Sequence, residues 1–356
     1  MEEMGITSFN TSKMKLGILT RGSELNGSSR LRAFQYTKHL QKVGVETRIL
    51  ARDQNPSLLL RSQYVMKAIS LAAWADVVLL QKPNQANRLI DLLHAVNPRL
   101  VVDFDDAVWA LPPGKSGPRA QKVSHEFGAR LRYAINRSRF AITGSHYLAE
   151  WVRKQCVNCD VTVIPTSVDL NDYEPVPTTN SDDSLTIGWI GSQGNLPDLT
   201  QVVSALVQLY KSHGPKLRVI SSCRPSLGDL NFDFEPWSAE TENEALRRLD
   251  IGIMPLVEDE RARGRCGFKA IQYMATGLPV IASPVGAACE VIEHGITGYF
   301  AATPEQWLAR FSELVENKTL RTRMGINGRK RVEKHYSIQS NLSLLLNTFE
   351  RRLSQS

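Results

Sequence analysis

The same three-part pattern occurs at two distant places in this chain: a short apolar strand, a loop with two glycines and a helix. The first copy has its strand over Lys15–Leu19 and its helix over Arg30–Val43. The second has its strand over Leu185–Ile190 and its helix over Leu196–Tyr210. Each copy predicts the start of a Rossmann-like sheet, in which ligands bind where the parallel strands end.

Short apolar runs alternate with helical patterns after both copies, which predicts parallel sheets covered by helices. In the first half, further strands are expected at Val45–Leu50, Val77–Leu80, Leu100–Asp103, Phe140–Thr143 and Val161–Ile164. In the second half they are expected at Leu217–Ser221, Asp250–Met254, Val280–Ala282 and Gly298–Phe300. The predicted fold class is therefore α/β with two Rossmann-like domains.

The polar, proline-bearing run Asn171–Ser184 marks a linker between these domains. We expect an N-terminal domain over residues 1–172, a linker over 173–184 and a C-terminal domain over 185–337. A last helix over 338–356 would cross back to the first domain. Thr303 and Gln306 form a predicted capping box at the start of a helix in the second domain. The chain has 356 residues, of which 42% are hydrophobic, and this is ample for two cores.

Composition and charge indicate whether the protein spans a membrane, is secreted or binds nucleic acid. No apolar run approaches the ~18 residues of a membrane helix, and the N-terminus lacks a signal-peptide pattern, so a cytoplasmic location is expected. The formal charge of +7 allows attraction to anionic lipid or to nucleic acid, but it is dispersed along the chain rather than concentrated in blocks. Five cysteines without a disulfide-like framework indicate a reducing compartment. Cys156 and Cys159 stand alone and are too few for a zinc site.

The segment Gly264–Gly286 has the pattern of a phosphate-binding site. A loop with cations enters a short helix, and an apolar strand and a glycine turn follow. Arg265 and Lys269 are four residues apart, so a helical first turn would place them on one face beside free backbone N–H groups. An ordinary amphipathic helix that packs on a core explains the same apolar spacing.

The residues Gln272–Ala282 resemble the signature of retaining family-4 glycosyltransferases of the GT-B fold, in which two Rossmann-like domains face each other across a cleft. The resemblance also covers Phe234–Ser238, Leu249–Leu256, Glu290–Tyr299 and the stretch from Arg323 to Ser337. It implies a sugar-nucleotide site in the second domain and an acceptor site in the first. It also implies that cations and helix N-termini, without a metal or other cofactor, stabilise the diphosphate leaving group.

The resemblance assigns candidate donor contacts and shows two departures from the family pattern. The donor diphosphate and sugar candidates are Arg265, Lys269, Gly191, Ser192, Gly267, Gln272 and Gly286, and the nucleoside candidates are Trp237 and Gln272. A lone tryptophan is also a common core residue. The turn after the first strand of the second domain lacks the family's cation pair. Gly264 and Gln272 stand where the family has two glutamates.

Three carboxylates lie close together at the end of a predicted strand in the first domain, at Asp103, Asp105 and Asp106. The resemblance places Asp105 and Asp106 at the family's His-Asp pair, so both are catalytic candidates. A metal-binding Asp-Phe-Asp motif of the other glycosyltransferase fold, GT-A, and simple helix capping are the alternatives. The acceptor-side candidates are Ser28, Ser29, Arg30 and Lys82.

The function expected from the resemblance is retaining, metal-independent transfer of a sugar from a nucleotide-diphosphate sugar to a glycan or lipid-linked acceptor. Such transfer belongs to the synthesis of cell-surface polysaccharides or glycoconjugates. Because many acceptors of such enzymes are lipid-linked, the resemblance implies peripheral contact with the cytoplasmic membrane face rather than nucleic-acid binding. A nucleotide-sugar epimerase or isomerase is one alternative, because the GT-B fold also hosts that chemistry. A catalytically silent sugar-nucleotide-binding protein is the other, because both family glutamates are missing.

Overall fold

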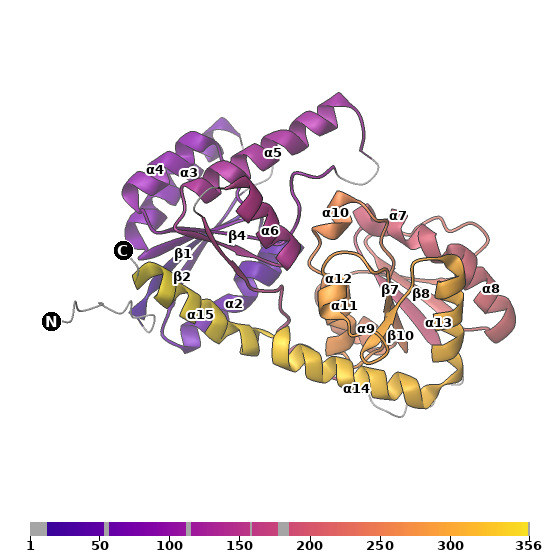
Figure 1. The fold of residues 1–356 in the computed structure, drawn as a ribbon. Helices are drawn as coiled ribbons and strands as arrows, with labels where there is room; N and C mark the ends of the chain where they lie inside the picture. Colours follow the sequence, from indigo (N-terminus) through magenta and orange to yellow (C-terminus); the bar gives the residue numbers. More distant parts are fainter. Residues whose placement is uncertain (1–12, 53–56, 112–114, 157–158, 177–184, 355–356) are drawn as a thin grey trace. The chain divides into compact units, whose positions relative to one another are not determined.

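The computed structural model describes residues 13–52, 57–111, 115–156, 159–176 and 185–354. The chain divides into two compact units (Figure 1). The first unit runs to Leu111, resumes over Ser116–Ser167 and includes the C-terminal segment from Ile338. The second consists mainly of Val168–Ser337. The boundary therefore comes after Ser167 rather than after residue 172, because Val168 donates its N–H to Tyr336 at 3.0 Å within the second unit.

The first unit is built on a six-stranded parallel sheet in the order β2-β1-β3-β4-β5-β6. Its strands are β1 Lys15–Thr20, β2 Glu46–Ala51, β3 Val77–Gln81, β4 Leu100–Phe104, β5 Phe140–Thr143 and β6 Asp160–Val163. Strands β3 and β4 are buried along their whole length, as expected where helices cover both faces of a parallel sheet.

Helices pack around this sheet. They are α1 Gly27–Ser29, α2 Gln35–Lys42, α3 Leu58–Trp74, α4 Asn87–Val96, α5 Pro118–Asn136, α6 His146–Gln155 and, at the C-terminus, α15 Ile338–Ser354. The predicted single helix over Arg30–Val43 is interrupted, because Arg30–Phe34 forms a π-helical turn between α1 and α2. Such turns occur frequently at functional sites.

The second unit has its own six-stranded parallel sheet in the order β12-β11-β10-β7-β8-β9. Its strands are β7 Thr186–Ile190, β8 Lys216–Ser221, β9 Asp233–Pro236, β10 Ile251–Met254, β11 Val280–Ala282 and β12 Gly298–Phe300. Its helices are α7 Leu196–Leu199, α8 Val203–His213, α9 Glu242–Arg247, α10 Glu260–Arg263, α11 Phe268–Ala275, α12 Ala288–Val291, α13 Pro304–Glu316 and α14 Lys318–His335. Two parallel sheets with helices around them confirm the predicted α/β class.

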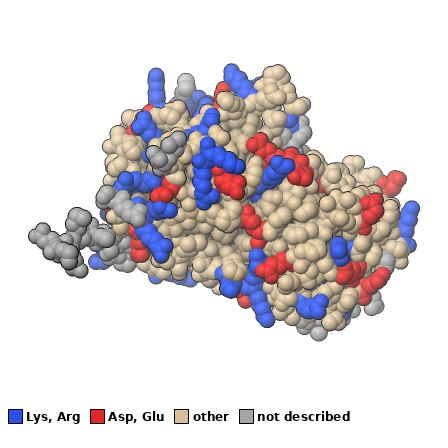
Figure 2. All heavy atoms as spheres, viewed as in Figure 1, with Lys and Arg blue, Asp and Glu red and all other residues tan. Residues whose placement is uncertain are grey.

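The predicted helix over Leu196–Tyr210 is also broken. A 3-10 turn over Thr200–Val202 separates α7 from α8. Trp189 on β7 and Trp307 on α13 are both fully buried in one core cluster of this unit. Within the described residues, no helix is both long and apolar enough to span a membrane. On the face drawn in Figure 2, basic and acidic side chains are interspersed.

The start of α13 permits a first test of local stability. Thr303 Oγ1 accepts a hydrogen bond from the Gln306 N–H at 3.3 Å, as expected for an N-cap. Gln306 Oε1 accepts in return from the N–H of Ala302 at 2.8 Å, one residue before the usual capping-box position.

Thr303→Ala should remove the N-cap bond and destabilise the first turn of α13 by about 1 kcal/mol. Hydrogen exchange at the Gln306 amide should then be faster by about fivefold. Thr303→Ser keeps the hydroxyl and is expected to exchange at nearly the wild-type rate. Equal acceleration in both variants would show that the hydroxyl does not cap this helix.

Candidate functional site

The predicted acceptor-side residues gather at the carboxyl edge of the first sheet. Ser28 lies in the short helix α1 after β1, and Lys82 directly follows β3. Asp105 and Asp106 directly follow β4. Because β1, β3 and β4 are parallel neighbours, their ends meet at one edge of the sheet, where open α/β sheets bind ligands.

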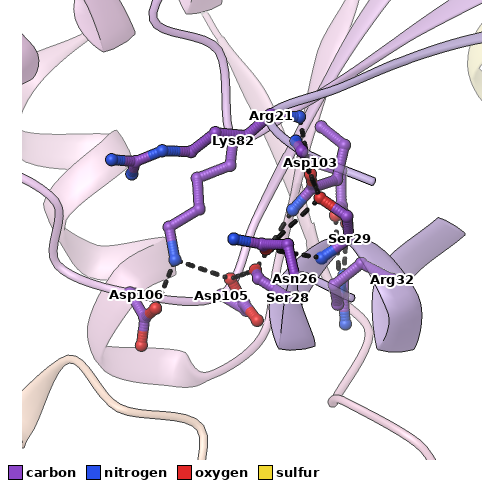
Figure 3. Close-up of polar contacts among 11 residues, drawn as sticks. Arg21, Asn26, Ser28, Ser29, Arg32, Lys82, Asp103, Asp105 and Asp106 are labelled. Atoms are coloured by element: carbon purple, nitrogen blue, oxygen red, sulfur yellow. Dashed lines mark hydrogen bonds and ion pairs between the residues drawn. The ribbon is translucent and has the colours of Figure 1, made fainter. Parts of the chain in front are cut away.

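Lys82 is the centre of this group (Figure 3). Its ammonium pairs with Asp106 and lies 3.4 Å from Oδ1 of Asp105. Its backbone has φ of +50°, in the left-handed region that a lysine rarely adopts, and its N–H donates to the Asp103 carbonyl at 2.6 Å. Strained backbone of this kind is common where a side chain must be aimed at a site.

Asp105 and Asp106 have different surroundings. Asp105 is 4% exposed and accepts a hydrogen bond from Ser28 Oγ, whereas 43% of the Asp106 side chain is exposed. Burial raises the pKa of Asp105, but the charges of Lys82 and Arg32 and the Ser28 hydrogen bond outweigh burial, so the net shift is downward. Burial likewise lowers the pKa of Lys82, but the two aspartates more than compensate and raise it. Asp105 is therefore a fixed negative charge at neutral pH.

A second layer of polar side chains holds Ser28 and the loop after β1. Gln81 donates to Ser28 Oγ at 3.1 Å and accepts from Ser29 Oγ at 3.1 Å. Ser29 Oγ also accepts from the N–H of Gly22 at 3.2 Å, and Asn26 caps α1 through the N–H of Ser29. Ser29, expected on the acceptor side, is buried within this layer. Arg30 begins the π-helical turn and is partly exposed.

Asp103, the third carboxylate of the sequence cluster, pairs with Arg32 rather than with Lys82. Both of its oxygens accept from the guanidinium of Arg32, which also donates to the Ile164 carbonyl at 2.7 Å. Each of the three aspartates thus lies against a cation. The described residues contain no group of three histidines, cysteines or acidic residues arranged to hold a metal ion.

In the second unit, the predicted phosphate-binding cations lie near the carboxyl end of β7. Lys269 is on the first turn of α11, and its ammonium lies over the Trp189 ring, 5.0 Å from the centroid. Arg265 precedes the helix and does not share a helical face with Lys269, because Gly267, in the left-handed region, breaks the turn between them. Arg265 instead pairs with Asp198 of α7.

The ammonium of Lys269 has no carboxylate partner among the residues that the structure describes. Burial and the neighbouring charges of Arg265 and Arg261 lower the pKa of Lys269 to about 7, and only Asp198 opposes this. A phosphate bound beside Lys269 would favour its charged form, so both its surroundings and its lowered pKa are those expected of a phosphate-binding lysine.

The glycines proposed as donor contacts have structural roles of their own. The Gly191 N–H donates to the Ile220 carbonyl at 3.0 Å, so this amide is not available for phosphate. A Cβ at Gly191 would lie 2.6 Å from the Trp189 ring and 3.0 Å from Cε of Lys269. The exposed Ser192 begins the 3-10 turn Gln193–Asn195.

Gly267 and Gly286 bring two loops together. Gly286 has φ of +57°, and a Cβ there would lie 2.5 Å from the Arg263 carbonyl oxygen. A Cβ at Gly267 would contact Val291 and Ala287. Both glycines thus allow the loop before α11 to pack on the turn before α12, which holds Arg265 and Lys269 in place.

Gln272 and Trp237, the nucleoside candidates, belong to one hydrogen-bonded network. Gln272 is 3% exposed, and its amide donates to Glu242 at 2.9 Å and to the hydroxyl of Tyr173 at 3.1 Å. Trp237 Nε1 donates to the other oxygen of Glu242 at 2.6 Å. The side-chain N–H groups of Gln272 thus donate within the protein, and its assignment as a ribose contact stays a prediction.

Sequence reasoning missed three side chains that shape these sites: Arg21, Asp198 and Glu242. Asp198 pairs with Arg265, which is far away in the sequence, so no local spacing marks it. Arg21 could have been found from the sequence, because it lies two residues after the first predicted strand.

The comparisons with known proteins agree with this architecture. Residues 186–317 match the family described as glycosyl transferases group 1. Spore coat protein SA of Bacillus subtilis (strain 168) is 35% identical over 83 residues, which are 22% of this chain and 22% of that relative. The match thus spans about a fifth of the relative's length.

Among solved structures, a glycosyltransferase from Rickettsia africae superposes with a TM-score of 0.73 at 14% identity, covering 97% of this chain and 100% of that chain. Anabaena Alr3699/HepE in complex with UDP and glucose has a TM-score of 0.69 at 14% identity, with 96% and 100% covered. Residues 186–317 thus match the glycosyl transferases group 1 family, and the two-sheet fold of the chain matches that of GT-B glycosyltransferase structures.

Proposed function

We propose that this protein transfers a sugar, with retention and without a metal, from a nucleotide-diphosphate sugar to a glycan or lipid-linked acceptor. The observation that carries the proposal is the uncompensated ammonium of Lys269 at the carboxyl end of β7, inside the matched family domain. A donor diphosphate would supply the negative charge that this ammonium lacks. The UDP bound to Alr3699/HepE supports a nucleotide diphosphate as the leaving group.

The first unit supplies the proposed acceptor side and the catalytic carboxylates. Ser28, Lys82, Asp105 and Asp106 form one hydrogen-bonded group that can orient an acceptor hydroxyl. The ionised Asp105 would stabilise positive charge that develops on the sugar in the transition state.

A lipid-linked acceptor and peripheral membrane contact are supported by the outer face of α3. Leu59, Leu60 and Met66 are exposed there, next to the exposed cations Arg61 and Lys67. Apolar side chains bordered by cations are typical of helices that lie on an anionic membrane face. We place the protein on the cytoplasmic side, where the five free cysteines would stay reduced.

A panel of nucleotide sugars, offered with and without glycan and lipid-phosphate acceptors, tests this proposal. We expect nucleotide release that requires an acceptor, a product that keeps the donor's anomeric configuration by NMR, and undiminished activity in excess EDTA. A changed sugar without acceptor would identify an isomerase. Binding without turnover across the panel would identify a silent sugar-nucleotide-binding protein.

A further inference from the structure

Three arginines from separate elements of the first unit lie beside the Lys82 group. Arg21 follows β1, Arg52 follows β2, and Arg130 is on α5. We call these three residues the arginine cluster. Lys82, and none of these three arginines, forms the ion pairs with Asp105 and Asp106.

The contacts of the arginine cluster are with neutral groups. Arg52 donates to the Asn84 carbonyl at 2.9 Å, and Arg130 donates to the side-chain oxygen of the same asparagine at 3.2 Å. The Arg21 guanidinium lies over the Phe127 ring, 4.5 Å from its centroid, and Phe127 is one helical turn before Arg130. In Figure 3 this guanidinium points away from the dashed hydrogen-bond network.

No carboxylate forms an ion pair with any member of the arginine cluster within the described part of the chain. Arg21 experiences the repulsive charge of Arg52 as well as the attraction of Asp105 and Asp106. Both aspartates already pair with Lys82, so the two carboxylates that attract Arg21 are shared with the Lys82 ammonium. Partly buried cations held together without an anion indicate a site for one.

We propose that the arginine cluster binds a phosphate group carried by the acceptor substrate. Guanidinium groups form paired hydrogen bonds that match the geometry of phosphate oxygens. The cluster lies at the same sheet edge as Ser28 and Asp105, so a phosphate held there would place the rest of the acceptor beside the proposed catalytic carboxylates. The identification of the ligand as an acceptor rests on the proposed function, whereas the phosphate site itself does not.

Titration with phenyl phosphate, followed by calorimetry, tests the site directly. The experiment uses the full chain with Lys269→Met, so that the proposed diphosphate site does not compete. Adding Arg21→Gln and Arg52→Gln together should weaken phenyl phosphate binding by about tenfold. Arg88→Gln, a change to an exposed arginine on α4 of the same unit, is the matched control and should leave binding unchanged.

A second variant distinguishes loss of the phosphate site from weaker phenyl phosphate binding that is caused only by misfolding. Asp106→Asn removes a carboxylate that attracts Arg21, and it should therefore tighten phenyl phosphate binding. Unchanged affinity in both the arginine double variant and Asp106→Asn would overturn the proposal. If the protein bound phenyl phosphate in this way but transferred no sugar, the site would stand and only the proposed function would fail.

Vesicles distinguish the two sources of such a phosphate. The protein could sediment with phosphatidate vesicles but not with phosphatidylcholine vesicles, and the arginine double variant could lose this sedimentation. That result would assign the site to a lipid-borne phosphate. Phenyl phosphate binding without sedimentation would assign it to a phosphate on a soluble glycan. Either result supports the site, and vesicle binding that the double variant retains would have to come from another surface.

Discussion

Asp105→Asn is expected to lower kcat for sugar transfer by about 100-fold or more, which corresponds to roughly 2.7 kcal/mol of transition-state stabilisation. Asparagine keeps the size of the side chain and an oxygen that accepts from Ser28. It removes only the negative charge that Lys82, Arg32 and Ser28 hold ionised at neutral pH. The measurement is kcat by acceptor-dependent nucleotide release, with the donor Kd measured separately.

The donor Kd should change little, because the proposed donor contacts come from other residues in the second unit. Asp91→Asn provides the control, since Asp91 is a partly exposed carboxylate of the same unit that pairs with Arg137. Thermal unfolding of both variants would reveal a general loss of structure. Full activity in Asp105→Asn would remove this carboxylate from the chemistry.

The sign of the pKa shift also limits what Asp105 can do. Its folded-state pKa is below the ordinary value, so it contributes stability above the unfolded pKa of about 4, and this contribution is lost as the pH falls. A carboxylate with a lowered pKa is a weak proton acceptor at neutral pH. Stabilising positive charge suits Asp105 better than general base catalysis.

Most of the sheet framework could be predicted because apolar runs that are buried on both sides have a strong local signal. Strand β9, Asp233–Pro236, is the exception, since a sequence with two acidic residues and a proline does not resemble a buried strand. It lies at the edge of its sheet, beside β8 alone, where proline and charged residues are tolerated. Its strand character depends on pairing with β8, which no local pattern reveals.

The site residues were harder to predict because their roles depend on distant partners. The spacing of Arg265 and Lys269 suggested one helical face, but the left-handed backbone at Gly267 starts the helix after Arg265. Gln272 was expected to face a ligand, yet Glu242, far away in the sequence, takes its amide. Local spacing cannot show whether a polar side chain will form hydrogen bonds with a ligand or with a distant residue of the protein. By contrast, Ser28, Lys82 and Asp105 follow strands that are neighbours in the sheet, so topology alone brings them together.

Lys269→Met is expected to weaken nucleotide-sugar binding by about 30-fold, which corresponds to the ~2 kcal/mol of a charge-assisted contact. Methionine keeps the unbranched stem that packs near Trp189 and Gly191 and removes only the charge. Arg263→Met is the matched control, because Arg263 is an exposed cation at the end of α10, just before this loop, and pairs with the exposed Glu258. The measurement is calorimetry of nucleotide-sugar binding. The diphosphate of a nucleotide sugar gains or loses no proton near neutral pH, so it does not contribute to the pH dependence.

The pH dependence separates a direct contact from a structural effect. Because burial and the charges of Arg265 and Arg261 lower the pKa of Lys269 to about 7, about half of the free protein lacks this charge at neutral pH. A bound diphosphate would favour the ammonium and raise its pKa, so the complex takes up a proton as it forms. Wild-type affinity should therefore be constant well below pH 7 and fall by up to about tenfold for each pH unit above it. Lys269→Met should abolish this slope, whereas a variant that merely loosened the loop would bind weakly and keep it.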